Sequence, residues 1–192
     1  MRLFIAVELE PSVRREAAAA GVRLAAALRR GLPGGRADVS WVRPDNLHLT
    51  LRFLGEVEES EALALVRRFP EPFAVEPFEI ELCGVGMFPS SGSPRVVWIG
   101  MTVGREELSA LAAQVDNRLA SWGFARETRP FQAHLTLGRC RQPLGPRARD
   151  LLTGVITSPV GRSRVDRLVL FESRLTAGAA TYVRQAVAPL AS

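Results

Sequence analysis

Short apolar runs alternate with longer amphipathic segments along this chain. Strands are predicted where apolar residues are continuous or occupy every second position, at 2–9, 39–42, 47–54, 73–88, 95–103, 134–140, 164–174 and 181–187. Apolar residues spaced three and four apart predict helices over 11–30, 60–69, 105–122 and 146–155. Pro11 suits the first turn of the first helix, and the run Gly31-Leu-Pro33-Gly-Gly ends it.

The order of these elements is repeated, strand and helix followed by further strands, in the two halves of the chain. Neighbouring strands are joined by short turns at 43–46 and 89–94, the second of them polar and expected to be mobile. Few helices and short strand connections favour an α+β fold with mostly antiparallel sheets over a doubly wound parallel sheet. No segment is long enough to act as a linker, so residues 1–192 are expected to form one domain.

Composition narrows the class of protein and the charge of its partner. The chain has 192 residues, 47% of them hydrophobic and 23% charged, which is typical of a globular protein. Its net charge of +5 favours an anionic partner. All 25 basic residues are arginine, although a bias in genomic base composition explains this more simply than a need for phosphate contacts.

The cysteines and the first residues predict a cytoplasmic protein. Cys83 and Cys140 lie far apart, outside any CxxC motif, and are expected to be buried as small hydrophobic residues. The leading apolar run is too short for a signal peptide and is followed at once by Glu8 and Glu10. No stretch approaches the length of a membrane span, so no membrane partner is expected.

The strongest signal is a repeated tetrapeptide. The chain has two histidines, His48 and His134, and each begins the sequence HLTL. Composition alone would produce the second match roughly once in a thousand trials. On a strand, His48 lies beside Thr50 and His134 beside Thr136, while the leucines face the opposite side. If the two halves pack around an approximate twofold axis, both polar faces meet across a cleft.

Two imidazoles and two hydroxyls suit one class of chemistry. Imidazoles titrate near neutral pH, so one can act as a base and the other as an acid. Threonine hydroxyls can donate to the anionic oxygens of a phosphate diester. Two histidines fall short of the three or four ligands of a zinc site, so neither a metal nor a cofactor is expected. A single strand histidine is usually a packing residue, but packing gives no reason for the chain's two histidines to share one context.

The two HLTL motifs resemble the signature of the two-histidine (2H) phosphoesterase superfamily. Over essentially the full chain the sequence is similar to the RNA 2',3'-cyclic phosphodiesterases, formerly called 2'-5' RNA ligases. The segments that carry this resemblance are MRLFIAVEL at 1–9, WVRPDNLHLTLRFLG at 41–55, FPSSGSPRVVWIG at 88–100, FQAHLTLGR at 131–139, and LFESRL at 170–175 with Tyr182 and Pro189-Leu190 beyond it. Ala133 departs from the family, which usually has proline before the second histidine.

This resemblance implies a bilobal fold of two antiparallel sheets flanked by helices, with the active site in the groove between lobes. It implies hydrolysis of a terminal 2',3'-cyclic phosphate to a 2'-phosphate without a metal. His48 would be the proton donor to the leaving 3'-oxygen, and His134 would be the proton acceptor that activates water. Thr50 and Thr136 would hold the non-bridging phosphate oxygens. The spacing of the motifs does not itself decide which histidine is the acid.

Several further residues are candidates for the site. Arg139 follows the second motif, as an arginine does in the family, and could clamp the phosphate. Its offset from His134 requires a bulge or the strand end near Gly138 to turn it inward. Arg52 has the right alternation to face the cleft. Candidates for lining the groove, each equally compatible with packing, are Arg43, Trp41 and Phe131.

The expected partner is RNA with a 2',3'-cyclic phosphate end, including tRNA fragments, or cyclic nucleotides, bound by a monomer. Two alternatives remain open. The same chemistry run backward, with a 5'-hydroxyl in place of water, would join RNA ends through a 2'-5' linkage. A binding module that retains RNA or nucleotide without turnover is the alternative from another class, although intact His and Thr in both motifs argue against it.

Overall fold

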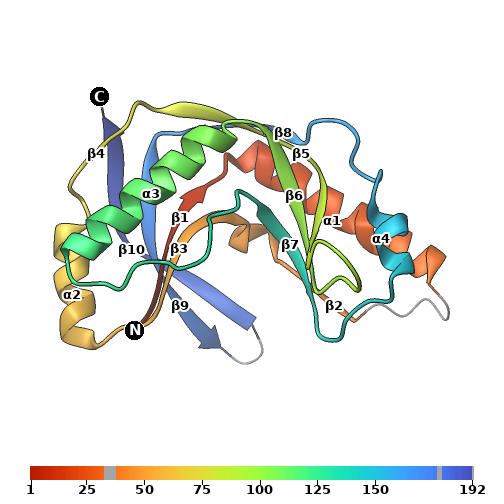
Figure 1. The fold of residues 1–192 in the computed structure, drawn as a ribbon, viewed down its shortest axis with the longest axis horizontal. Coiled ribbons are helices and arrows are strands. Elements are labelled where there is room, and N and C mark those ends of the chain that lie inside the picture. The colour runs from red at the N-terminus through yellow and green to blue at the C-terminus, as the bar shows by residue number, and fades with distance from the viewer. Residues whose placement is uncertain (33–37, 177–178, 192) are drawn as a thin grey trace.

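A computed structural model describes residues 1–32, 38–176 and 179–191 as two lobes, each built on a five-stranded sheet (Figure 1). The first sheet has the order β3 (His48–Glu56), β1 (Arg2–Glu8), β9 (Arg167–Thr176), β10 (Ala179–Ala191) and β4 (Phe73–Ala74). The second has the order β2 (Val39–Trp41), β7 (Leu135–Cys140), β6 (Val96–Val103), β5 (Phe78–Phe88) and β8 (Gly161–Val165).

Both sheets are antiparallel apart from the short parallel pair of β4 and β10. In each sheet the strand that carries or follows an HLTL histidine pairs with a strand that runs directly into a long helix: β3 with β1, and β7 with β6. The predicted α+β class, the two antiparallel sheets and their internal repetition are therefore confirmed.

The helices cross between the lobes. The helices in the described residues are α1 (Pro11–Gly31), α2 (Glu59–Arg68), α3 (Arg105–Ser121), α4 (Arg147–Leu152) and a 3₁₀ turn, η2 (Pro44–Asn46). Helix α1 follows a strand of the first sheet but packs with α4 on the second, and α3 follows a strand of the second but packs on β3 of the first (Figure 1). Within the described segments, every helix falls short of the length and hydrophobicity needed to cross a bilayer.

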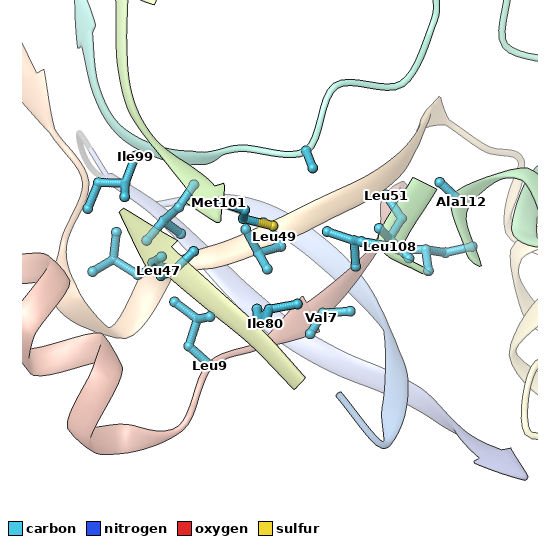
Figure 2. Close-up of a cluster of buried hydrophobic side chains, with 14 of the residues drawn as sticks. Val7, Leu9, Leu47, Leu49, Leu51, Ile80, Ile99, Met101, Leu108 and Ala112 are labelled. Carbon is cyan, nitrogen blue, oxygen red and sulfur yellow. The ribbon is translucent and has the colours of Figure 1, made fainter. Parts of the chain in front are cut away.

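One core joins the two lobes. Buried side chains from β1 and β3 of the first sheet lie in the same cluster as side chains from β5 and β6 of the second and from α3 (Figure 2). Strands are exchanged as well, since β5 from the first half of the chain completes the second sheet, and β9 and β10 complete the first. Burial of this shared apolar surface fixes the lobes against each other.

Several predicted elements differ from the structure. The predicted strand 73–88 is two strands in different sheets, because Pro77 has no N–H with which to continue a ladder. The predicted strand 164–174 likewise changes sheets at Asp166, between β8 and β9. The last helix is shorter than 146–155, and Gly154 beyond it has a positive φ of 87°. The strand predicted at 181–187 extends over 179–191 as β10. The Pro-Gly-Gly part of the predicted end of the first helix lies outside the described residues.

Neither cysteine is fully buried, contrary to prediction. Cys83 and Cys140 are both half-buried. Burial raises the pKa of the Cys140 thiol, so this side chain is held in its uncharged form.

Candidate active site

The first HLTL motif lies on β3, with its polar residues on one face of the first sheet. In the ladder with β1, His48 is opposite Glu8 and Thr50 is opposite Ala6. Leu49 is 1% exposed and faces the shared core. We call the face that carries His48 and Thr50 the cleft face of the first sheet.

Two register shifts in β3 change the alternation after Thr50. The pairing with β1 slips once between Ile5 and Ala6 and again between Leu3 and Phe4. As a result Phe53 pairs with Phe4, which lies on the cleft face, whereas Arg52 pairs with the core residue Ile5. The strict alternation assumed for Arg52 from the sequence is therefore wrong.

The second motif is presented by the second sheet in a similar way. His134 lies immediately before β7, and Thr136 within β7 pairs with Trp98. The ladder slips by one residue between Val97 and Trp98, and beyond the slip Arg139 pairs with Val96. This irregularity lies beside Gly138 and turns the Arg139 side chain to the same face of β7 as Thr136. Both residues line the cavity described below.

Each imidazole is fixed by a backbone carbonyl two residues before it. His48 Nδ1 lies 2.7 Å from the Asn46 carbonyl oxygen, and His134 Nδ1 lies 2.7 Å from that of Gln132. A carbonyl can only accept, so Nδ1 carries the hydrogen in both rings. The proton that each ring gains or loses therefore belongs to Nε2. On His48 this atom lies 3.0 Å from the Thr50 hydroxyl.

Aromatic rings surround both histidines. The His48 ring lies 4.9 Å from Phe4 and 5.2 Å, edge-on, from Tyr182, measured between centroids. His134 lies 5.0 Å from Phe88 in a perpendicular arrangement, and 5.8 Å from Trp98. These apolar neighbours remove water from the imidazoles and hold their planes.

The surroundings make both histidines weaker bases than usual. Burial lowers the pKa of His48 from 6.5 to about 4. The hydrogen bond to Asn46 opposes this shift, the positive charge of Arg139 adds to it, and the negative charge of Glu8 opposes it. Burial also lowers the pKa of His134, and Arg139 adds to this against a backbone hydrogen bond. Both rings are consequently uncharged near neutral pH, with Nε2 able to accept a proton.

The two motifs meet in one cavity of about 550 Å³, which we call the histidine cavity. It is lined by His48, Thr50, His134, Thr136 and Arg139, and it extends along the first sheet toward Arg2, Phe53, Leu175 and Tyr182. A second cavity of about 760 Å³, here the side cavity, shares Thr50, Phe53, His134, Thr136 and Arg139 with it. The structure thus brings all five predicted site residues together.

Arg52 joins β3 to α3 at the wall of the side cavity. Its Nη1 donates to Glu127 at 2.9 Å, its Nη2 to the Ala125 carbonyl, and its Nε lies 3.4 Å from Asp116. Asp116 in turn accepts from the backbone N–H of Glu127 at 3.0 Å. The guanidinium is therefore occupied by the segment that leads to His134 and is not aimed at the histidine cavity.

The three weaker candidates separate in the structure. Phe131 lines the side cavity. Trp41 lies on the far side of β7, between Gly138 and Gly21 of α1, and is a packing residue. Arg43 is exposed and lines neither of the cavities that hold the histidines. In the described part of the chain, no three His, Cys, Asp or Glu side chains are grouped closely enough to hold a metal.

Comparison with known proteins identifies the family. The model for LigT-like phosphoesterases matches residues 13–98 and residues 99–181, so each matched segment contains one HLTL motif. The chain belongs to the LigT-like phosphoesterase family. This LigT-like phosphoesterase is 39% identical over 176 residues to a protein of Archaeoglobus fulgidus named RNA 2',3'-cyclic phosphodiesterase, covering 92% of this chain and 93% of the relative. A protein of the same name from Methanothermobacter thermautotrophicus is 34% identical over 187 residues, 95% of each chain.

Solved structures agree with this assignment. The LigT-like phosphoesterase superposes on a Thermus thermophilus protein with a TM-score of 0.71 and 29% identity, covering 99% and 98% of the two chains. E. coli LigT complexed with 3'-AMP gives a TM-score of 0.69 at 28% identity, covering 100% and 98%.

Sequence reasoning missed the residues that surround the motifs. Phe4, Phe88 and Trp98 contact the imidazoles from neighbouring strands, and their place depends on sheet pairing. The orienting carbonyls had a weak signal, since Asn46 and Gln132 both stand two residues before a histidine. Every residue has a backbone carbonyl, however, so the residue types at these positions do not predict that it accepts from the histidine.

Proposed function

We propose that this LigT-like phosphoesterase hydrolyses RNA 2',3'-cyclic phosphate ends to 2'-phosphates, using its two histidines as acid and base without a metal. The observation that carries the proposal is the paired geometry. Two imidazoles with the same fixed tautomer, two threonine hydroxyls and one guanidinium line one cavity. The names of the relatives support the substrate class.

In the proposed reaction a water oxygen attacks phosphorus and gives its proton to Nε2 of His134. The bond between phosphorus and the 3'-oxygen breaks, and the 3'-oxygen takes a proton from Nε2 of His48. The products are a 2'-phosphate monoester and a 3'-hydroxyl. Thr50 and Thr136 donate to non-bridging oxygens, and Arg139 balances the charge that grows on them.

The donor role of His48 depends on the substrate. In the free protein its pKa is about 4, so the ring is uncharged at pH 7. A phosphate anion beside the imidazole favours the charged form and offsets the effect of Arg139. We infer that substrate binding protonates His48, whereas His134 enters the reaction already able to accept.

The test is hydrolysis of an RNA oligomer ending in a 2',3'-cyclic phosphate, with excess EDTA, by the wild type and by His134→Ala and His48→Ala variants. We expect a 2'-phosphate product that EDTA does not affect. Either substitution should lower turnover by about two to four orders of magnitude while the fold is retained. RNA binding without turnover in the wild type would instead support the binding-module alternative.

Ligation is the second candidate, and the side cavity favours it. This cavity shares both threonines and His134 with the histidine cavity, so a second RNA strand could reach the same phosphate. Adding an RNA with a 5'-hydroxyl to the same assay should then give a product containing a 2'-5' linkage. Hydrolysis alone at high concentrations of this RNA would count against ligation.

A further inference from the structure

The histidine cavity is lined by two arginines at different places. Arg139 lies beside the histidines, and Arg2 lies where the cavity extends along the first sheet. Neither guanidinium makes a hydrogen bond or ion pair within the part of the chain that the structure describes. Arg52 and Arg129, which line the side cavity, are both paired with Glu127. Arg2 is thus free to bind an anion in the way that Arg139 is.

Strand β1 sets the spacing between these two positive charges. Ala6 pairs with Thr50 at the catalytic end, and Arg2 lies four residues earlier on the same face. At about 3.3 Å per residue, the Cα atoms of Ala6 and Arg2 are about 13 Å apart. The arginine side chain is long enough to bring its guanidinium back along the cavity to a phosphate one nucleotide away from the reacting one.

The wall of the histidine cavity near Arg2 is apolar and exposed. Leu175 is 78% exposed and Phe53 is 56% exposed, and both line the histidine cavity with Tyr182. Exposed aromatic and aliphatic surface beside unpaired arginine is suited to the ribose and base of a nucleotide. Glu56 pairs with Arg2 in the strand ladder, yet it forms no ion pair with Arg2 among the described residues.

We propose that Arg2 forms a second phosphate site, which binds the phosphate on the 5'-oxygen of the nucleotide whose 2',3'-cyclic phosphate reacts. This inference rests on the proposed function, because it takes the reacting phosphate to lie between the histidines. The shared chemistry is a 5'-phosphoryl group, either the internucleotide phosphate of RNA or a terminal 5'-phosphate. The enzyme accordingly favours substrates that are longer or more phosphorylated than a nucleoside cyclic phosphate.

Binding of two stable product-like ligands tests the site without turnover. Adenosine 2'-phosphate and adenosine 2',5'-bisphosphate are titrated calorimetrically into the wild type, Arg2→Gln and Arg67→Gln. Arg67 is the matched control, since it is exposed on α2 and lines none of the cavities described here. We expect the 5'-phosphate to tighten binding about tenfold in the wild type and in Arg67→Gln, and by less than about twofold in Arg2→Gln.

Kinetics with three substrates then identify the source of the phosphate. Adenosine 2',3'-cyclic phosphate, its 5'-phosphorylated form and the dinucleotide ApA 2',3'-cyclic phosphate are compared by kcat/KM. The loss of kcat/KM in Arg2→Gln should be smallest for adenosine 2',3'-cyclic phosphate, which has no 5'-phosphate. Loss for the dinucleotide alone assigns the site to RNA, and loss for both phosphorylated substrates extends it to terminal phosphates.

Two results would overturn the proposal: equal binding of both ligands by the wild type, or an unchanged preference in Arg2→Gln. Failure of the proposed function looks different. In that case none of the cyclic phosphates is hydrolysed, while the difference in ligand binding and its loss in Arg2→Gln remain.

Discussion

At the scale of residues, each imidazole is oriented by a backbone carbonyl and enclosed by aromatic rings. The carbonyl fixes Nδ1–H through a neutral acceptor, and the Glu8 carboxylate offsets only part of the lowering of the His48 pKa. Burial and Arg139 then keep both histidines uncharged in the free protein. In the proposed reaction, the substrate anion therefore sets the charge state of the site.

Titration of His48 with and without a product-like ligand tests this dependence. We expect bound adenosine 2'-phosphate to raise the pKa of His48 from about 4 by about two pH units, because an anion lies next to the ring. NMR of the imidazole carbons measures it, and a His134→Asn variant leaves a single histidine signal to follow. A pKa that stays near 4 in the complex would assign the donor role to the other histidine.

Gly86 makes room for one of the rings that enclose His134. A Cβ at Gly86 would overlap the six-membered ring of Trp98, which packs against His134. We expect Gly86→Ala to lower the free energy of unfolding by about 1–3 kcal/mol and to reduce kcat, because Trp98 must shift. The control is Gly145→Ala, where nothing lies within 4 Å of the added atom. Equal effects of the two substitutions, measured by denaturation and turnover, would exclude this role for Gly86.

At the scale of elements, α3 and the segment after it hold the second histidine against the strand that carries the first. Arg52 leaves β3 to contact Asp116 on α3 and Glu127 beyond its end. Its side chain is 11% exposed, so the contacts are largely shielded from solvent. Glu127 lies only a few residues along the chain before Gln132, whose carbonyl orients His134, so a contact that holds Glu127 also holds this segment.

Replacing Arg52 should therefore affect both stability and catalysis. We expect Arg52→Gln to cost about 2 kcal/mol of unfolding free energy, since it removes the shielded cation from Asp116 and Glu127 and leaves them only the exposed Arg126 and Arg129. It should also lower kcat by about tenfold with a smaller change in KM, because the segment before His134 is less well held. Arg162→Gln, which removes an ion pair with Glu81 at the solvent-exposed surface of the second sheet, serves as the control and should change the free energy of unfolding much less. A loss of stability without any change in kcat would limit Arg52 to a structural role.

At the scale of the whole molecule, exchanged strands and helices tie the lobes together around the cavity. The first sheet takes β9 and β10 from the second half of the chain, and the second sheet is covered by α1 from the first half. Neither sheet can form from one half alone, and the shared core spans both. The cavity is thereby built between surfaces that fold as a unit.

This arrangement predicts how stability responds to acid. The folded pKa of His48 is about 4 and the value in an unfolded chain is 6.5, so between these pH values the unfolded state binds more protons. The contribution of His48 is complete above pH 6.5 and is lost as the pH falls toward 4, amounting to at most about 3 kcal/mol. Urea denaturation of the wild type and His48→Gln at pH 7 and pH 4.5 measures it. The variant should lose clearly less stability on acidification, and parallel losses would contradict the assignment.

The sequence by itself determined the residues of the candidate site and most of the elements. Both histidines and both threonines were identified because a repeated HLTL motif is independent of fold, and long periodic segments such as α1 and α3 form largely where the periodicity predicts. The class of the fold also followed, since short turns between strands favour antiparallel pairing.

Only the tertiary structure decided which residues join the motifs in the site. Pairing registers placed Arg52 away from the histidine cavity and Arg139 in it, and a one-residue slip that no local pattern signals reverses the face of a side chain. Of the two aromatic candidates, Trp41 packs against α1, whereas Phe131 lines the side cavity. Arg2 lies next to the cavity because β1 runs along it. These relations join residues far apart in the chain, so they depend on packing of the complete molecule and not on the local sequence.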